Sequence, residues 1–180
     1  TALTLLANTL ATVFALYFLI TIFGDHSSHF NPVVSMVMLL RKEISTQVCT
    51  VFIILQISGA ILGVMLANYI FELDPVLFSE KPRSGTHLFV SEILATFGLL
   101  MVILLSSKEK VAVTVAAYIG AAYWFTSSTS FANPAGTIGR SFSNTFAGIS
   151  TNDILHFCVA QIIGAFLALI VYRTFFESQK

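Results

Sequence analysis

Charge is what this sequence has least of. Only 10% of its 180 residues are charged, whereas 56% are hydrophobic. A soluble domain usually carries about 25% charged residues, so this chain has too few to cover a surface that faces water. Its nine basic and nine acidic residues cancel, which excludes nucleic-acid binding through a basic patch. The composition therefore predicts a protein that lies in a lipid bilayer.

Cysteines and catalytic clusters are scarce as well. The two cysteines, Cys49 and Cys158, lie inside apolar runs, where cysteine usually packs as a small hydrophobic residue. We therefore expect no disulfide, no metal site and no cofactor. No nucleophile is paired with a base, so we expect no enzymatic activity. The first apolar segment has no basic leader and is too long for a signal core, so we expect no cleavable signal peptide.

Long apolar runs are abundant. A transmembrane helix needs about 20 mostly apolar residues, and five segments fit: 3–23, 44–71, 86–106, 111–128 and 154–176. If the chain starts outside, its inside loops hold six basic residues and its outside loops three, which places the C-terminus in the cytoplasm. The inside residues are Arg41, Lys42, Lys108, Lys110, Arg173 and Lys180, and the outside ones are Lys81, Arg83 and Arg140.

The two halves of the chain repeat a pattern. "ILQISGAIL" at 54–62 matches "VAQIIGAFL" at 159–167, and an Asn-Pro pair occurs at both 31 and 133. The nearly constant offset predicts one domain over 1–180, with repeats at about 1–71 and 86–176 that are inverted in the membrane. The offset maps 86–106 onto positions before residue 1. We therefore expect the opening span of the first repeat to be absent from this chain.

Each Asn-Pro pair begins an apolar stretch that is too short to span a membrane. Asparagine is a favoured N-cap, and proline suits the first position of a helix. Each pair thus predicts a half-helix that starts near the membrane midplane. Inverted half-helices would meet start to start, so their positive dipole ends and two asparagine amides would converge on one point. Such a point attracts neutral hydrogen-bonding molecules and repels cations, including hydronium.

Together these motifs resemble the aquaporin, or major intrinsic protein, family of water and small-solute channels. The resemblance rests on "HFNPV" at 29–33, "FANPA" at 131–135, "SEILATF" at 91–97 and the two Gln-x-x-Gly-Ala segments. It implies an all-α membrane protein, an inverted-repeat bundle with two re-entrant half-helices and five transmembrane helices, where the family has six. The chain is similar to bacterial aquaglyceroporin-like members, which implies a homotetramer in the inner (plasma) membrane.

The resemblance also implies roles for individual residues. Glu92 corresponds to a buried acid that holds a re-entrant loop by its backbone, and the alternative is a proton-relay carboxylate. Gln56 and Gln161 would be structural. His29 would lie at the cytoplasmic mouth, where gating, pore lining and packing all remain open. The residues of the two pore motifs are Asn31, Pro32, Val33, Asn133, Pro134 and Ala135.

The sequence departs from the family pattern at both motifs. Val33 replaces an alanine and would narrow the midplane slightly. The position of the usual filter arginine is Gly136, and the nearest arginine is Arg140, which would either donate into the filter or position the loop. The aromatic residues nearby would either narrow the filter or anchor the spans at the interface; they are Tyr123, Trp124, Phe125 and Phe131. The other filter positions carry small residues, Thr12, Ala121 and Ser130, which imply a wide constriction.

These observations predict a passive channel for water and small neutral solutes, such as glycerol-like polyols, urea-like molecules or undissociated metalloid acids. The alternatives are an ion-coupled secondary transporter and a truncated, non-conducting membrane protein. Channels and transporters share inverted repeats with broken helices. Glu92 is the only acidic residue inside the spans, which favours the channel.

Overall fold

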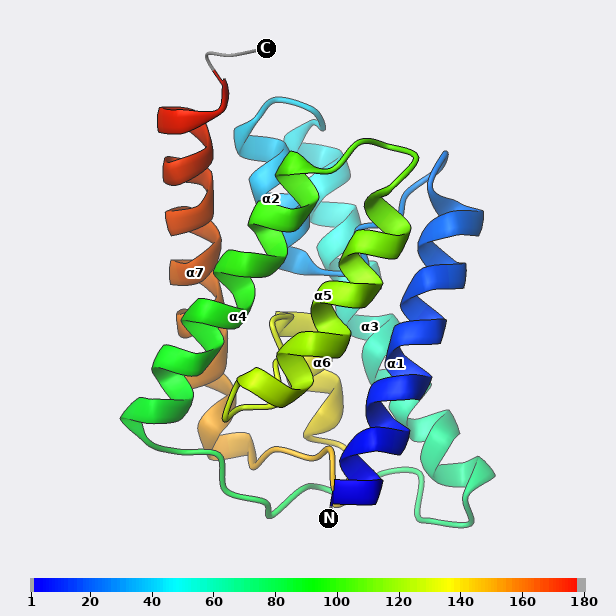
Figure 1. The fold of residues 1–180 in the computed structure, drawn as a ribbon. Helices are drawn as coiled ribbons and strands as arrows, with labels where there is room; N and C mark the ends of the chain where they lie inside the picture. Colours follow the sequence, from blue (N-terminus) through cyan, green and yellow to red (C-terminus); the bar gives the residue numbers. More distant parts are fainter. Residues whose placement is uncertain (1, 178–180) are drawn as a thin grey trace.

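The structure is a computed structural model that describes residues 2–177, and within this range the regular elements are all helices (Figure 1). Four helices are long and apolar enough to cross a membrane. They are α1 (Ala2–Phe23), α3 (Thr46–Ile70), α4 (Thr86–Leu105) and α7 (Ile154–Phe175), the last preceded by the short 3-10 turn η1 (Thr151–Asp153). The all-helical membrane fold predicted from the sequence is confirmed.

The fifth expected span is shorter than the apolar run predicted. Helix α5 covers Val111–Phe125, which is 15 residues, whereas the sequence indicated a span over 111–128. The helix ends because Thr126 takes an extended conformation. From there the chain passes back toward the centre of the bundle.

Two half-helices lie inside the bundle, α2 (Pro32–Leu40) with nine residues and α6 (Pro134–Arg140) with seven. Each begins as the Asn-Pro pairs predict. The side-chain oxygen of Asn31 accepts a hydrogen bond from the Val33 backbone N–H, and that of Asn133 accepts from those of Ala135 and Gly136. The proline at the first helical position loses nothing there, because its missing N–H would have no partner in the helix.

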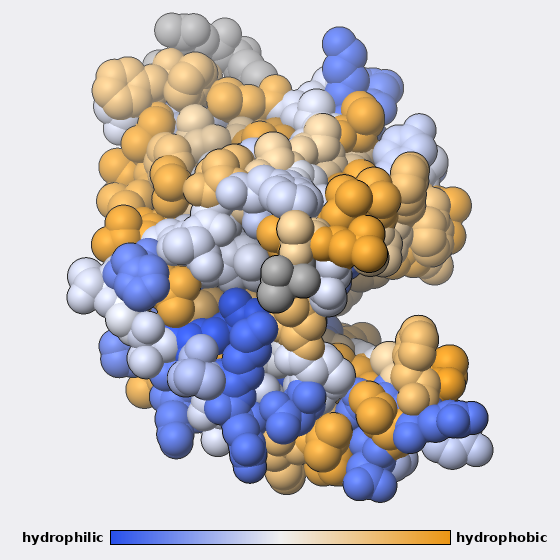
Figure 2. Space-filling view, turned by 60° about the horizontal axis from the view of Figure 1, so that its bottom comes forward, coloured by the Kyte–Doolittle hydropathy of each residue, from blue (hydrophilic) through white to orange (hydrophobic). Residues whose placement is uncertain are grey.

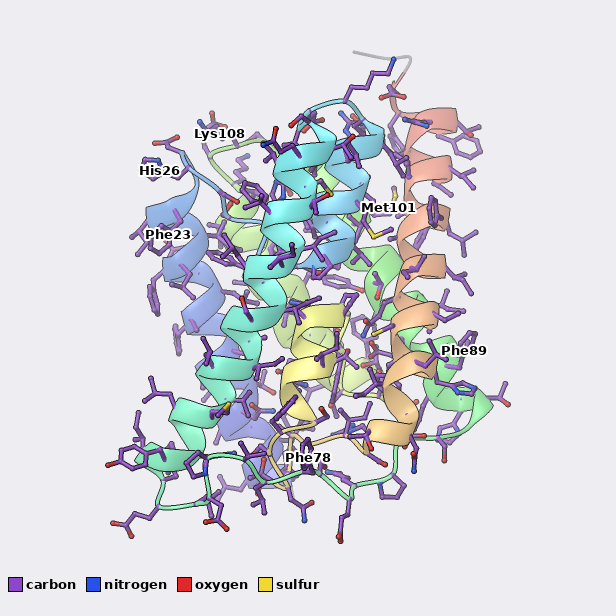
Figure 3. The ribbon with its side chains drawn as sticks, turned by 180° about the vertical axis from the view of Figure 1, so that it is seen from behind. Phe23, His26, Phe78, Phe89, Met101 and Lys108 are labelled. Atoms are coloured by element: carbon purple, nitrogen blue, oxygen red, sulfur yellow. The ribbon has the colours of Figure 1, made fainter. Side chains whose placement is uncertain are left out.

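The bundle has two distinct ends. In Figure 1 the start of α1 and the segments 71–85 and 141–153 lie at the bottom, which we term the lower end, and α7 finishes at the opposite, upper end. Figure 3 shows Phe78 at the lower end and His26 and Lys108 at the upper end. An ion pair of 2.7 Å between Lys108 Nζ and Asp25 Oδ1 joins two loops at the upper end. Helix α4 packs along α7, α1 along α5 and α3 against α6.

The flanks of the bundle are apolar and exposed. Only 6% of the most apolar 18-residue stretch of α3 is buried. Leu62 and Leu66 on this helix are 63% and 58% exposed. Figure 2 shows hydrophobic side chains along the flanks and hydrophilic ones gathered on the lower end, which is tilted forward. Exposing such a surface to water would be costly, so the chain is an integral membrane protein.

Two glycines that match in the repeats have different surroundings. At Gly164 on α7, a Cβ atom would collide with the carbonyl oxygen of Ile93 and lie 3.1 Å from Thr96 Cβ, because α4 approaches closely there. At Gly59, the matching position of α3, a Cβ atom would have nothing within 4 Å. The close packing of α4 on α7 therefore has no counterpart on this part of α3 among the described residues.

We expect Gly164→Ala to destabilise the fold by about 1–3 kcal/mol, because the added methyl group would force α4 and α7 apart. Gly59→Ala is the matched control: it should be neutral or stabilising by up to about 1 kcal/mol, because alanine is the better helix former. Thermal unfolding of both variants in detergent micelles measures the difference. Equal melting temperatures would contradict this packing.

Candidate functional site

The two half-helices begin near one another, and each capping asparagine binds the loop of the other. Asn31 Nδ2 donates to the carbonyl oxygen of Ala132 at 2.7 Å, and Asn133 Nδ2 donates to that of Phe30 at 2.8 Å. The oxygen of each asparagine is already bound to its own helix. Because a side-chain amide carries two hydrogens, each asparagine keeps one N–H for a further acceptor.

The carbonyl groups that accept these bonds belong to residues with a left-handed backbone. Phe30 has φ 48° and Ala132 has φ 47°, and Thr129 and Ser130 are also left-handed. This conformation costs a non-glycine residue roughly 1–2 kcal/mol, and it persists only where the surroundings fix it. Here the unusual turn directs each carbonyl group toward the opposite asparagine.

A cavity of about 200 Å³ passes the two asparagines. Near the lower end its lining includes Tyr123 and Arg140, and near the upper end Met38 and Val111. Most of the wall is apolar. Its other lining residues include Leu16, Ile20, Val34, Leu99, Ile103, Val115 and Ile119.

A few polar groups interrupt the apolar wall. Asn31 and Asn133 line the middle of the cavity, and Ser130 lines it toward the lower end. Within the described residues, the buried Ser130 Oγ has no hydrogen-bond partner. A small solute inside the cavity therefore meets donors and acceptors at a few fixed places.

Glu92 lies behind the loop that precedes the second motif, with 0% exposure. Its carboxylate accepts hydrogen bonds from the backbone N–H groups of Phe131 and Ala132, both at 2.9 Å, and from Gln161 Nε2 at 2.7 Å. Gln161 Nε2 also donates to Thr137 Oγ1 at 2.9 Å. Glu92 is not among the residues that line the cavity. This arrangement favours a role in holding the loop over a role as a proton relay.

In the first repeat, a histidine takes part in the corresponding network. Gln56 Nε2 donates to Ser35 Oγ at 3.0 Å, and Ser35 Oγ lies 3.0 Å from His29 Nδ1. His29 lines the cavity and packs edge-on against Phe52, with 5.6 Å between the ring centroids. Among the roles that the sequence left open, these contacts favour pore lining and packing. Gln56 Oε1 has no partner among the described residues.

Arg140 and two aromatic side chains line the cavity toward the lower end. Arg140 Nη2 donates to Tyr123 Oη at 3.0 Å, and Tyr123 Oη lies 3.0 Å from Thr12 Oγ1. The guanidinium carbon of Arg140 is 4.2 Å from the centroid of the Phe131 ring. These four side chains line the cavity together with Ser130 and Gly136. Arg140 thus reaches the cavity from one helical turn beyond Gly136, and the lining at the expected filter is not made of small residues alone.

Two expected site residues lie elsewhere. Ala121 is exposed and does not line the cavity, whereas Tyr123 does. Two residues turn a helix by about 200°, which places them on different faces of α5. Val33 is fully buried and lines a separate small pocket with Ile162 and Phe166 of α7, so it does not narrow the midplane. Pro32, Pro134 and Ala135 are buried beside their asparagines.

The fold and the cavity define a membrane protein of channel type, in which two half-helices meet inside a helical bundle. Residues 1–172 match the model of the family described as Major intrinsic protein. The chain is 46% identical over 176 residues to "Aquaglyceroporin AqpS" of Rhizobium meliloti (strain 1021). The alignment covers 96% of this chain and 76% of that protein. The chain therefore belongs to the major intrinsic protein family, whose members are membrane channels.

Glu92→Gln should destabilise the protein by about 1–3 kcal/mol, because an amide N–H₂ group would then face one of the donors that the carboxylate binds and leave it unsatisfied. Glu109→Gln, at an exposed position of the upper end, is the control and should change stability little. Thermal unfolding in micelles compares the two. If both variants melt at the wild-type temperature, Glu92 does not hold the loop.

Proposed function

We propose that the protein is a passive channel for water and small neutral solutes such as glycerol-like polyols, urea-like molecules or undissociated metalloid acids. The main support is the pair of reciprocal bonds from Asn31 and Asn133 at a mostly apolar cavity. The name of the similar aquaglyceroporin supports glycerol-like solutes within this class.

Permeation requires only an exchange of hydrogen bonds. A water molecule or a solute hydroxyl gives up a hydrogen bond to a neighbouring molecule. In its place it accepts a hydrogen bond from the free N–H of Asn31 or Asn133. Ser130 Oγ offers a further partner toward the lower end. The apolar wall provides no competing partners, so the solute binds weakly enough to leave again.

Cations are disfavoured in the same cavity. The half-helices direct the positive ends of their dipoles at the asparagines, and Arg140 adds a full positive charge at the cavity wall. Among the described residues, Arg140 makes no ion pair that would offset this charge. We infer that ions and hydronium are excluded on these grounds.

A channel explains the site better than an ion-coupled transporter does. Among the residues that the structure describes, no aspartate or glutamate that could bind a coupling cation lines the cavity. We further infer that the upper end faces the cytoplasm, since more basic residues lie there. The family relationship supports a homotetramer in a bacterial inner membrane.

Reconstitution into vesicles tests the proposal. We expect glycerol and water to enter wild-type vesicles faster than empty ones in a stopped-flow light-scattering assay. The glycerol rate should be the same with and without a sodium or proton gradient, because nothing in the cavity couples the solute to an ion. A flux that appears only with a gradient would establish the transporter instead, and no flux above empty vesicles would refute the channel.

A further inference from the structure

One buried cation of the lower end has no role in the site described above. Arg83 lies in the segment between α3 and α4, is only 7% exposed and does not line the cavity. None of the described carboxylates forms a salt bridge with its guanidinium. Burial and the nearby charge of Arg140 lower the pKa of Arg83 to about 10, so it remains charged at neutral pH. The nearby charge of Glu92 favours the charged form of Arg83, but a buried cation without a direct ion-pair partner is still costly and calls for a function.

Arg83 joins several segments of the lower end. Its Nε donates to the carbonyl oxygen of Gly148 at 2.7 Å, its Nη1 to that of Ser128 at 3.1 Å and its Nη2 to that of Phe146 at 3.3 Å. Its backbone N–H donates to Asp153 Oδ2 at 2.7 Å. The planar guanidinium thus fixes the segments that precede and follow α6 relative to one another, which a lysine could not do with the same geometry.

The same guanidinium contacts the aromatic ring that Arg140 contacts. The guanidinium carbon of Arg83 is 4.6 Å from the centroid of Phe131, and that of Arg140 is 4.2 Å from it. Attraction between a cation and the face of an aromatic ring orients both partners. Phe131 is therefore held by Arg83 from outside the cavity while its ring forms part of the cavity wall.

Arg140 depends on this ring for its position. It is the last residue of a half-helix of only seven residues, and within residues 2–177 its side chain has one hydrogen bond, to Tyr123. The Phe131 ring is the second contact that keeps its guanidinium at the cavity wall. Any shift of the ring would change both the width of the constriction and the place of the charge.

We propose that Arg83 is a positioning residue for solute selection, which holds the Phe131 ring against Arg140 and so sets the width and the charge of the constriction. This inference rests on the proposed channel function. It assigns selection of small polyols over larger polyols and organic cations to a side chain that no solute touches.

The experiment compares wild-type protein with Arg83→Lys and Arg83→Met in vesicles, using glycerol, xylitol and methylammonium as solutes. Arg173→Met is the matched control, because Arg173 lies at the upper end, where Arg173 Nη2 donates to the carbonyl oxygen of Leu40. Both Arg83 variants should raise the ratio of xylitol to glycerol flux, because neither can hold the three carbonyl groups in the geometry that the planar guanidinium fixes. Arg83→Met should also raise the ratio of methylammonium to glycerol flux about tenfold, because a positive charge is lost; Arg83→Lys should raise it less.

The results separate this inference from the proposed function. If wild-type vesicles show no glycerol flux, the channel itself is refuted. If the wild type conducts and both Arg83 variants keep its flux ratios, the positioning role is refuted. If Arg83→Lys keeps the wild-type xylitol ratio while Arg83→Met changes it, charge alone matters and the positioning role is again refuted.

A second variant keeps the inference testable if the Arg83 variants do not fold. Phe131→Leu removes the ring but leaves Arg83 bound to its carbonyl groups, and it should raise the ratio of xylitol to glycerol flux in the same direction. An unchanged ratio in this variant would overturn the inference. Where the Arg83→Lys variant folds, the double variant with Phe131→Leu should have the same ratio of xylitol to glycerol flux as Phe131→Leu alone. If the two substitutions change this ratio additively, Arg83 does not act through the ring.

Discussion

The structure depends on the two hydrogen bonds that cross between the half-helices. A membrane offers no water to bind the backbone groups of a helix that stops halfway, so every such group needs a partner inside the protein. Asn31 and Asn133 supply these partners to the carbonyl groups of Ala132 and Phe30. They also cap their own helices, and each keeps one amide hydrogen. The contact that makes two broken helices tolerable in the bilayer thus also provides the polar centre of an apolar cavity.

The two repeats support this centre in different ways. In the second repeat Glu92 binds the loop backbone, and Gln161 links the carboxylate to α6. In the first repeat Gln56 binds Ser35, as Gln161 binds Thr137, but no carboxylate of the described residues accepts a hydrogen bond from Gln56. The side-chain oxygens of both glutamines have no partner among the described residues. The inverted symmetry therefore holds for the backbone elements more closely than for the side-chain networks around them.

The sequence predicted the features whose signals are local. Asn-Pro pairs determine where α2 and α6 begin, and apolar runs locate the long helices to within a few residues. It could not give the rotation of α5, which places Tyr123 rather than Ala121 at the cavity, because the whole helix is apolar and has no polar face to orient it. Nor could it give the reach of Arg140, which depends on contacts with residues distant in the chain. Arg83, in a charged loop segment, looks like an ordinary exposed residue until the fold buries it.

A double-mutant cycle on Asn31→Ala and Asn133→Ala, measured by equilibrium unfolding in micelles, tests the central claim most directly. The cycle subtracts the loss of each helix cap and leaves the coupling between the two asparagines. If the reciprocal bonds hold the two half-helices together, breaking one side already loosens the other, and the coupling should be about 1–3 kcal/mol. Strictly additive effects would show that the half-helices are held independently, which would contradict the account.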